Sequence, residues 1–221
     1  MFNNIRPAPD RAIALARYHT LAEHYDESCR WLGPIRMAAL DLLALRPGDT
    51  VFDIACGTGA MLSALAYAVG PYGRVVGIEL SPDMAAIAAR RVTEAGLKNV
   101  EVFVSSVEDA VPGYAADALL LCYTHDVLQS DRAIERLVEM TRPGARTVIA
   151  GAKLLGWWAA PLNIWKLWRS RHYLTTYQGL RVPWARIATH SPDLHVHRTY
   201  TLGTSYLAVG HLCGKAAPHS G

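Results

Sequence analysis

Residues 51–59 read VFDIACGTG, an apolar run followed at once by a glycine-rich turn. We predict a buried strand over residues 50–54, because a short apolar run between turn residues is typical of a strand covered on both faces. A helix from about residue 60 to residue 69 follows the turn. Glycines at such a junction let a ligand approach the backbone closely, and a helix N-terminus favours anions. The junction therefore predicts a ligand site, with a plain tight turn as the alternative.

Strands and helices alternate on both sides of this junction. Two helical pieces, split at Gly33-Pro34, are predicted over residues 10–45. Further strands are predicted at 74–79, 100–105, 118–123 and 147–151, and further helices at 81–95 and 131–140. This alternation indicates a parallel sheet with helices on both faces. Residues 195–200 and 205–212 flank a glycine-containing turn and predict a terminal hairpin. The fold class is therefore α/β: a doubly wound, mostly parallel sheet with a C-terminal antiparallel hairpin.

Glu79 ends the second predicted strand. In a doubly wound sheet, ligands bind at the carboxyl ends of the strands, and an acid at this position can accept hydrogen bonds from both hydroxyls of a ribose. A surface glutamate at a strand end is the alternative. The position of Glu79, at the end of the strand that follows the glycine turn and its helix, favours the ligand-binding interpretation.

Three segments together resemble the class I S-adenosylmethionine-dependent methyltransferase family. They are DIACGTG at 53–59, GIELSPDM at 77–84 and NVEVF at 99–103. The resemblance covers roughly residues 18–151. It implies a Rossmann-like fold, S-adenosyl-L-methionine as cofactor and methyltransferase activity. A nicotinamide dehydrogenase would carry G-x-G-x-x-G, whereas here Gly57 and Gly59 are followed by Leu62.

The resemblance also implies the positions that bind the cofactor. The methionine part of the cofactor would be lined by Asp53, Ala55, Gly57 and Gly59, and its ribose would be bound by Glu79. The adenine would pack against Leu80 and Met84, and its edge would lie beside Ser106 and Val107. Tyr123 would border the site from the end of the fourth strand. Two positions depart from the family pattern. Ala55 stands where many members have glycine, and Ser106 where many have an aspartate for the adenine amino group.

Three further residues are candidates for the catalytic side of the site. His125 follows the fourth strand and could act as a general base, since its pKa lies near working pH; positioning or packing against substrate is the alternative. Asp126 could orient His125 or cap the next helix. The resemblance suggests that Tyr25 belongs to a lid over the cofactor, with simple core packing as the alternative.

The last seventy-one residues combine aromatic and basic side chains. Trp157, Trp158, Trp165 and Trp168 predict a substrate wall, with the tryptophans turned inward and the arginines turned outward or toward an anionic group. A membrane-interface surface and a core or dimer contact are the alternatives. Residues 151–221 carry eight basic side chains and one acidic one, a charge of +7, whereas the whole chain carries +3. This asymmetry indicates an anionic substrate or surface near this segment, or a solvated basic face.

The remaining composition bounds the class of protein. The 221 residues fit one domain, which we divide into a helical lid (1–45), a cofactor-binding core (46–152), a substrate segment (153–192) and a terminal hairpin (193–214). The four cysteines form no CxxC pair, so neither disulfides nor a metal site are expected. No signal-peptide or membrane-spanning run is present, which predicts a cytoplasmic protein.

These features predict methyl transfer from S-adenosylmethionine to a small apolar or aromatic metabolite. An N-methyltransferase of phospholipid or another anionic lipid, and a domain that binds the cofactor without transferring methyl, are the alternatives. Nucleic acid is not expected as a partner, because the basic residues are interleaved with large apolar ones. Peripheral membrane contact and a homodimer are left open.

Overall fold

The structure, a computed structural model, describes residues 6–214, so Lys215 of the basic segment lies outside the described residues. A single seven-stranded sheet has the order β3-β2-β1-β4-β5-β7-β6. The strands are β1 (Thr50–Ile54), β2 (Arg74–Glu79), β3 (Val100–Val104), β4 (Ala116–Cys122), β5 (Thr141–Ala152), β6 (His195–Tyr200) and β7 (Ser205–Leu212). The helices are α1 (Arg11–Leu21), α2 (Tyr25–Ser28), α3 (Gly33–Leu43), α4 (Leu62–Val69), α5 (Pro82–Glu94), α6 (His125–Leu128), α7 (Asp131–Glu139), α8 (Ala160–Ser170) and α9 (Ala185–Ala188), with short 3-10 turns η1 (Ala22–His24), η2 (Arg30–Leu32), η3 (Trp157–Ala159) and η4 (Thr201–Gly203).

The predicted fold class is confirmed. Strands β1 to β5 pair in parallel, β7 runs antiparallel to β5, and β6 pairs antiparallel to β7. The C-terminal hairpin thus forms one edge of an otherwise parallel sheet. Strand β5 is longer than predicted, because it includes residues 142–144, whose Arg-Pro-Gly sequence is typical of a turn. An irregularity in the pairing between Ala116 and Ala118 accommodates the extra residues.

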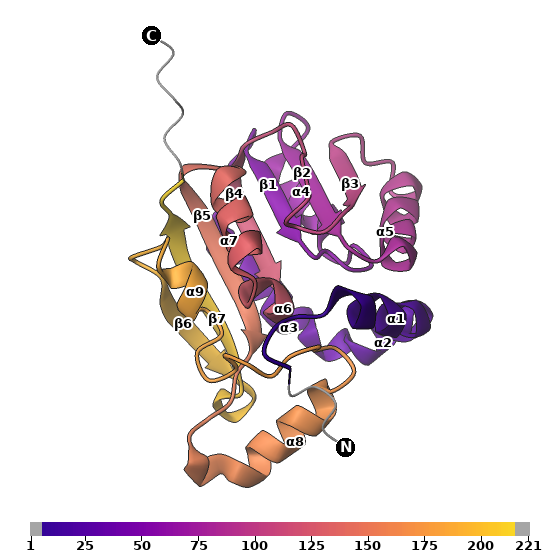
Figure 1. Cartoon of the computed structure of the whole chain (residues 1–221). Coiled ribbons are helices and arrows are strands. Elements are labelled where there is room, and N and C mark those ends of the chain that lie inside the picture. Colours follow the sequence, from indigo (N-terminus) through magenta and orange to yellow (C-terminus); the bar gives the residue numbers. More distant parts are fainter. Residues whose placement is uncertain (1–5, 215–221) are drawn as a thin grey trace.

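Helices cover both faces of the sheet (Figure 1). On one face, α3 packs against β4 and β5, α4 against β1 and β2, and α5 against β2 and β3. These helices bury apolar side chains such as Leu43 and Leu65. On the other face, α7 buries Ile134 and Leu137 with Phe52 of β1. The side chain of Ser81 accepts a hydrogen bond from the amide of Met84 and caps α5, as the Ser-Pro pair predicts.

The N-terminal helices and α8 lie together at one end of the sheet (Figure 1). The parallel strands run toward this end, so their carboxyl ends face α1, α2 and α8. The N-terminal region is broken more often than the single Gly33-Pro34 break predicts, because η1 and η2 interrupt it as well. Among residues 6–214, no helix combines the length and the apolar character needed to cross a bilayer.

Candidate functional site

Three residues with left-handed backbone conformation lie at the carboxyl edge of the sheet. Their φ angles are +51° at Ala55, +58° at Gly57 and +60° at Tyr123. Residues other than glycine seldom adopt this backbone conformation, because it is strained. Where such strained residues occur, they often lie at functional sites. Here the three residues turn the chain sharply as it leaves β1 and β4.

Glu79 holds the glycine turn in place. Its carboxylate accepts a hydrogen bond from the amide of Gly57 at 2.9 Å and another from the amide of Ser81 at 2.8 Å. The side chain is only 5% exposed, and this burial raises the pKa of Glu79 despite the opposing effect of the amide hydrogen bonds. A carboxylate has about four lone-pair sites, so both oxygens can accept further hydrogen bonds.

Three adjoining cavities open at this edge. The turn cavity, about 110 Å³, is lined by Gly57 and Glu79. The edge cavity, about 80 Å³, lies beside Ser106 and shares Ala55 and Leu80 with the turn cavity. The large cavity, about 410 Å³, lies on the other side of the turn cavity toward α8. Tyr18, Tyr25, Tyr123, Thr124, His125, Tyr173 and Leu174 line both the large cavity and the turn cavity.

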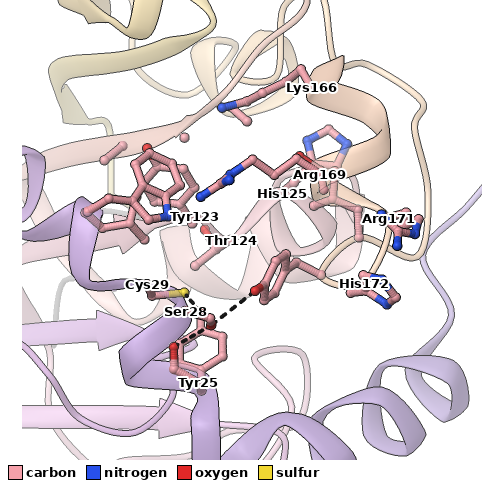
Figure 2. A pocket seen from close by; sticks show the side chains of 18 of the residues that line it. Tyr25, Ser28, Cys29, Tyr123, Thr124, His125, Lys166, Arg169, Arg171 and His172 are labelled. Carbon is pink, nitrogen blue, oxygen red and sulfur yellow. Dashed lines mark hydrogen bonds between the residues drawn. The ribbon is translucent and has the colours of Figure 1, made fainter. Parts of the chain in front are cut away.

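Figure 2 shows how distant parts of the chain contribute to the large cavity. Tyr25, Ser28 and Cys29 come from α2 and its end, Tyr123, Thr124 and His125 from the end of β4, and Lys166 and Arg169 from α8. Lys166 and Arg169 lie across the cavity from Tyr25 and Ser28. The site is thus formed by the sheet edge, the N-terminal helices and the segment after β5.

The cavities are covered by two chain segments that hydrogen-bond to each other, which we call the roof: residues 6–28 and 171–178. The hydroxyl of Tyr18 donates to the carbonyl of Tyr173 at 3.2 Å, and the hydroxyl of Tyr173 donates to Ser28 Oγ at 3.1 Å. The amide of Asp10 donates to Thr175 Oγ1 at 3.0 Å. Part of the predicted lid (residues 6–28) and part of the predicted substrate segment (residues 171–178) therefore form one cover.

Comparison with known proteins identifies the domain that carries this edge. Residues 51–144 match the family model described as a methyltransferase domain. The segment over residues 51–144 is a methyltransferase domain of the class I, S-adenosylmethionine-dependent type. This identification confirms the resemblance of the three sequence segments, and S-adenosylmethionine is the cofactor of the family.

Individual relatives agree with the family match. The nocamycin O-methyltransferase of Saccharothrix syringae is 30% identical over 154 residues, which is 66% of this chain and 55% of that protein. A methyltransferase of Aquifex aeolicus has a similar structure, with a TM-score of 0.55, 22% identity and coverage of 80% and 89% of the two chains. The geranyl diphosphate C-methyltransferase of Streptomyces coelicolor has a TM-score of 0.62, 16% identity and coverage of 83% and 80%. The chain spans about half the length of the curated relatives it matches.

The residues at the turn fit the cofactor of a methyltransferase domain. A Cβ placed on Gly57 would have no neighbour closer than Tyr25 Cε1, at 3.8 Å, so the side of the turn that faces the cavity is open. Most predicted cofactor residues line this space: the turn cavity is lined by Ala55, Gly57, Glu79, Leu80, Met84 and Tyr123, and the edge cavity by Leu80, Ser106 and Val107.

Two predicted cofactor residues lie behind the cavity wall. A Cβ on Gly59 would meet Ala88 Cβ at 2.9 Å, so this glycine permits close packing of the turn against α5. Asp53 is 3% exposed inside β1. Burial raises the pKa of Asp53 to about 7, with a smaller opposing effect from Arg36. Neither residue lines any of the three cavities.

The hydroxyl of Ser106, beside the edge cavity, is hydrogen-bonded to Asp109. This hydroxyl donates to Asp109 Oδ2 at 2.6 Å and accepts from the amide of Asp109 at 3.2 Å. The position where the family resemblance implies an aspartate is thus occupied by a serine that is hydrogen-bonded to Asp109.

His125 lines both the large cavity and the turn cavity. Its Nε2 lies 2.9 Å from the carbonyl oxygen of Gln178. A carbonyl can only accept, so Nε2 carries the proton and Nδ1 bears the lone pair. Nδ1 is buried and has no hydrogen-bond partner among residues 6–214. Burial lowers the pKa of His125 to about 4, although the hydrogen bond to Gln178 opposes this effect, so the ring is neutral at pH 7.

The predicted pairing of Asp126 with His125 is wrong. The carboxylate of Asp126 accepts hydrogen bonds from the amide of Thr175, at 3.1 Å, and from its hydroxyl, at 2.6 Å. Adjacent residues of a helix do not face each other, so the two side chains at the start of α6 reach different partners. Gln178 orients His125, and Asp126 fixes the roof to α6.

Tyr25 lies where the large cavity and the turn cavity meet. Its ring contacts those of Tyr18 and Tyr173 edge-on, with centroids 6.3 Å and 6.0 Å away. The next residue, Asp26, accepts a hydrogen bond from Thr58 in the glycine turn at 2.6 Å and pairs with Arg91 of α5. These contacts explain why α2 sits directly over the turn.

The prediction that the tryptophans turn inward is wrong for most of them. Trp157, Trp158 and Trp165 are 88%, 70% and 42% exposed and do not line the large cavity; Trp168 lines it but is 55% exposed. The side chain of Asn163 hydrogen-bonds to Leu155 N at 2.9 Å and to Leu155 O at 3.1 Å. This anchor turns the face of α8 that carries Asn163 and Lys166 toward the protein, and the tryptophans outward.

The sequence patterns did not single out several residues that line the large cavity. They are Trp31, Lys166, Arg169 and Tyr206. Of these residues, only those of α8 lie in a pattern that could have been noticed. Leu162, Lys166 and Arg169 are spaced so that they share one face of a helix, but Lys and Arg on a helix face ordinarily indicate that the face is exposed to solvent.

Proposed function

We propose that this chain transfers a methyl group from S-adenosylmethionine to a small-molecule acceptor with an apolar or aromatic body. The observation that carries the proposal is the shared wall of the two cavities. Tyr25, Tyr123, Thr124 and His125 line both the turn cavity and the large cavity. A cofactor in one and an acceptor in the other would therefore meet between these side chains.

Each cavity has residues suited to its part. Glu79 would accept hydrogen bonds from the ribose hydroxyls, Leu80 and Met84 would pack on the adenine, and Ala55 and Gly57 would border the methionine part. Bound S-adenosylmethionine supplies a methyl group on a cationic sulfur. The chain holds the acceptor in line with that methyl group, and such alignment contributes up to roughly 7–11 kcal/mol in favourable cases.

His125 would take the proton of a hydroxyl acceptor through Nδ1. A neutral ring at pH 7 is the form that can accept a proton, and the carbonyl of Gln178 keeps Nε2 protonated. The roof would exclude water from the transfer. Tyr25 closes the junction above the turn, and Asp126 holds the roof to α6 through Thr175.

The named relatives support a small-molecule acceptor. Nocamycin, aklanonic acid and geranyl diphosphate appear in the names of three of them. The large cavity, at about 410 Å³, has a volume typical of sites for small ligands. The cytoplasmic location that the sequence predicts stays part of this proposal.

The test of this proposal is product formation. The protein is incubated with S-adenosylmethionine carrying a labelled methyl group and a panel of hydroxylated aromatic and isoprenoid acids, and methylated product and S-adenosylhomocysteine are measured by mass spectrometry. We expect both products in equal amounts with at least one acceptor. Tight cofactor binding without either product across the panel would favour a domain that binds the cofactor without transferring methyl.

In the Glu79→Ala variant we expect S-adenosylmethionine affinity to fall by roughly 10- to 100-fold. The lost charge-assisted hydrogen bonds to the ribose are worth about 1.5–3 kcal/mol. Titration calorimetry measures the affinity, and a thermal melt verifies the fold. Glu94→Ala is the matched control, because Glu94 is a 67% exposed carboxylate on α5. Equal affinities of the two variants would remove Glu79 from the cofactor site.

The exposed aromatic surface of η3 and α8 favours a second candidate, methyl transfer to an anionic lipid at a membrane surface. Trp157, Trp158 and Ile164 are 88%, 70% and 66% exposed. Basic residues flank this stretch in the sequence, with Lys153 before it and Arg169 and Arg171 after it. Exposed tryptophan beside basic residues suits a membrane interface.

Sedimentation with vesicles of phosphatidylcholine and phosphatidylglycerol separates the two candidates. If the protein binds the membrane through this surface, the Trp157→Ala/Trp158→Ala variant should sediment severalfold more weakly than the unmodified protein. Tyr72→Ala is the control, because Tyr72 is 94% exposed and lies outside this surface. If the protein stays in the supernatant, the lipid candidate is excluded. A concentration-dependent dimer that the double variant abolishes would instead assign the surface to a homodimer contact.

A further inference from the structure

The large cavity contains a buried cation. Lys166, on α8, is only 5% exposed. Its Nζ donates a hydrogen bond to Ser205 Oγ at 3.2 Å and lies 5.6 Å from the centre of the Trp31 ring. Burial of an ammonium group is strongly disfavoured unless an opposite charge compensates it. Burial and the charge of Arg169 lower the pKa of Lys166 to about 8, which still leaves the side chain mainly charged at neutral pH.

No carboxylate of the described chain compensates this charge. Arg169 and other basic side chains line the same cavity, whereas no Asp or Glu does. None of the ion pairs within residues 6–214 includes Lys166 or Arg169. The guanidinium of Arg169 lies 5.4 Å from the centre of the Trp31 ring. Figure 2 shows it extending from α8 toward the end of β4, on the same side of the cavity as Lys166.

Two buried hydroxyl groups in the wall also lack partners. Tyr206 on β7 is 0% exposed and Thr124 is 6% exposed, and the hydroxyl of neither makes a hydrogen bond with residues 6–214. Buried polar groups are normally hydrogen-bonded, and an unsatisfied one is costly. A hydroxyl can donate to an oxyanion, so both groups suit the kind of ligand that the two cations favour.

Much of the remaining cavity wall is apolar or aromatic, with Trp31, Leu32 and Leu128 among its residues. We propose that the large cavity binds a small molecule with an apolar body and an anionic group, a carboxylate or a phosphate, and that Lys166 and Arg169 hold the anionic group. Arg169 can bind either oxyanion with two parallel hydrogen bonds, and Lys166 adds a point charge.

The identity of the methylated end rests on the proposed function. With the anionic group at Lys166 and Arg169, the other end of the ligand extends toward Tyr25 and His125, where the large cavity meets the turn cavity. The binding of the anion itself depends only on the cavity and can be measured without cofactor.

Calorimetry with three matched probes tests the proposal: 2-naphthoate, 2-naphthyl phosphate and the neutral 2-naphthamide. In the unmodified protein we expect at least one anion to bind roughly 10- to 100-fold more tightly than the amide, the effect of charge-assisted hydrogen bonds. In Lys166→Met and Arg169→Met this preference should largely disappear, while binding of the amide is retained. Lys166→Met removes a buried charge and keeps an apolar chain of similar length, so it should fold.

Arg90→Met is the control, because Arg90 is a 67% exposed cation on α5, outside the cavity lining. Equal affinity for the anions and the amide, no measurable binding of either anion, or an unchanged preference in both cavity variants would overturn the proposal.

Failure of methyl transfer with a preserved anion preference would contradict the proposed function alone. Methylation of neutral acceptors without any anion preference would contradict this inference alone. The relative affinities for naphthoate and naphthyl phosphate distinguish a carboxylate ligand from a phosphate ligand.

Discussion

In the Gly57→Val variant we expect binding of S-adenosylmethionine to be lost while the protein stays folded. The backbone at Gly57 has a φ of +58°, and a Cβ there would point into open space with Tyr25 Cε1 at 3.8 Å as its nearest neighbour. The methyl groups of valine would occupy the turn cavity, where the cofactor is proposed to lie. The strained backbone should cost about 1–3 kcal/mol of stability. Calorimetry measures the binding and a thermal melt the stability.

Gly48→Val separates strain from steric exclusion. Gly48 has a φ of +92° and lies in an exposed turn, and a Cβ added to it would have no atom within 4 Å. We expect this variant to lose similar stability and to keep its cofactor affinity. If Gly57→Val also bound normally, the turn cavity would not be the cofactor site.

In the His125→Ala variant we expect turnover with the true acceptor to fall by roughly 10²–10⁴-fold, the usual contribution of a general base. Cofactor affinity should change little, because Glu79 and the glycine turn are untouched. The unpartnered Nδ1 is the atom that would accept the proton. His197→Ala is the control, because His197 is an exposed histidine on the edge strand β6.

The pH profile distinguishes a base from a positioning residue. The pKa of His125 is lowered to about 4, so the active neutral form is lost as pH falls through about 4, well below the usual range of histidine. The acid limb of kcat/KM should therefore lie near pH 4 and vanish in His125→Ala. A limb near pH 7 that survives in this variant would not arise from His125. A raised KM with an unchanged limb would show that His125 only positions the acceptor.

The sheet could be predicted from the sequence because each strand carries a local signal. Apolar runs bounded by Gly, Pro and Asn fall at β1, β2 and β3, and the Ser81-Pro82 cap marks the start of α5. The location of the turn cavity could be predicted as well, whereas the assignment of its residues to the cofactor rests on the family resemblance and stays a prediction. Its residues lie at strand ends, and the carboxyl ends of parallel strands meet at one edge whatever the details of packing.

The acceptor side could not be predicted in the same way, because its geometry depends on packing between distant segments. The position of Asn163 against Leu155 sets the rotation of α8, and nothing in the periodicity of α8 shows which amphipathic face is covered. Trp and Lys both combine an apolar part with a polar tip, so either can face inward. Trp31 and Tyr206 come from η2 and from β7 and meet only in the folded chain.

The hydrogen bonds between residues 6–28 and 171–178 have a kinetic consequence. The turn and edge cavities, at about 110 and 80 Å³, are each smaller than the roughly 300 Å³ lower bound of typical small-ligand sites, so we expect the roof to move when a cofactor enters. Both segments must separate from the sheet edge, breaking contacts such as Asp10 to Thr175 and Thr175 to Asp126. Because the same cover lies over the acceptor cavity, we expect one opening event to admit both reactants and release both products, and the frequency of that event would then limit the rate of the catalytic cycle.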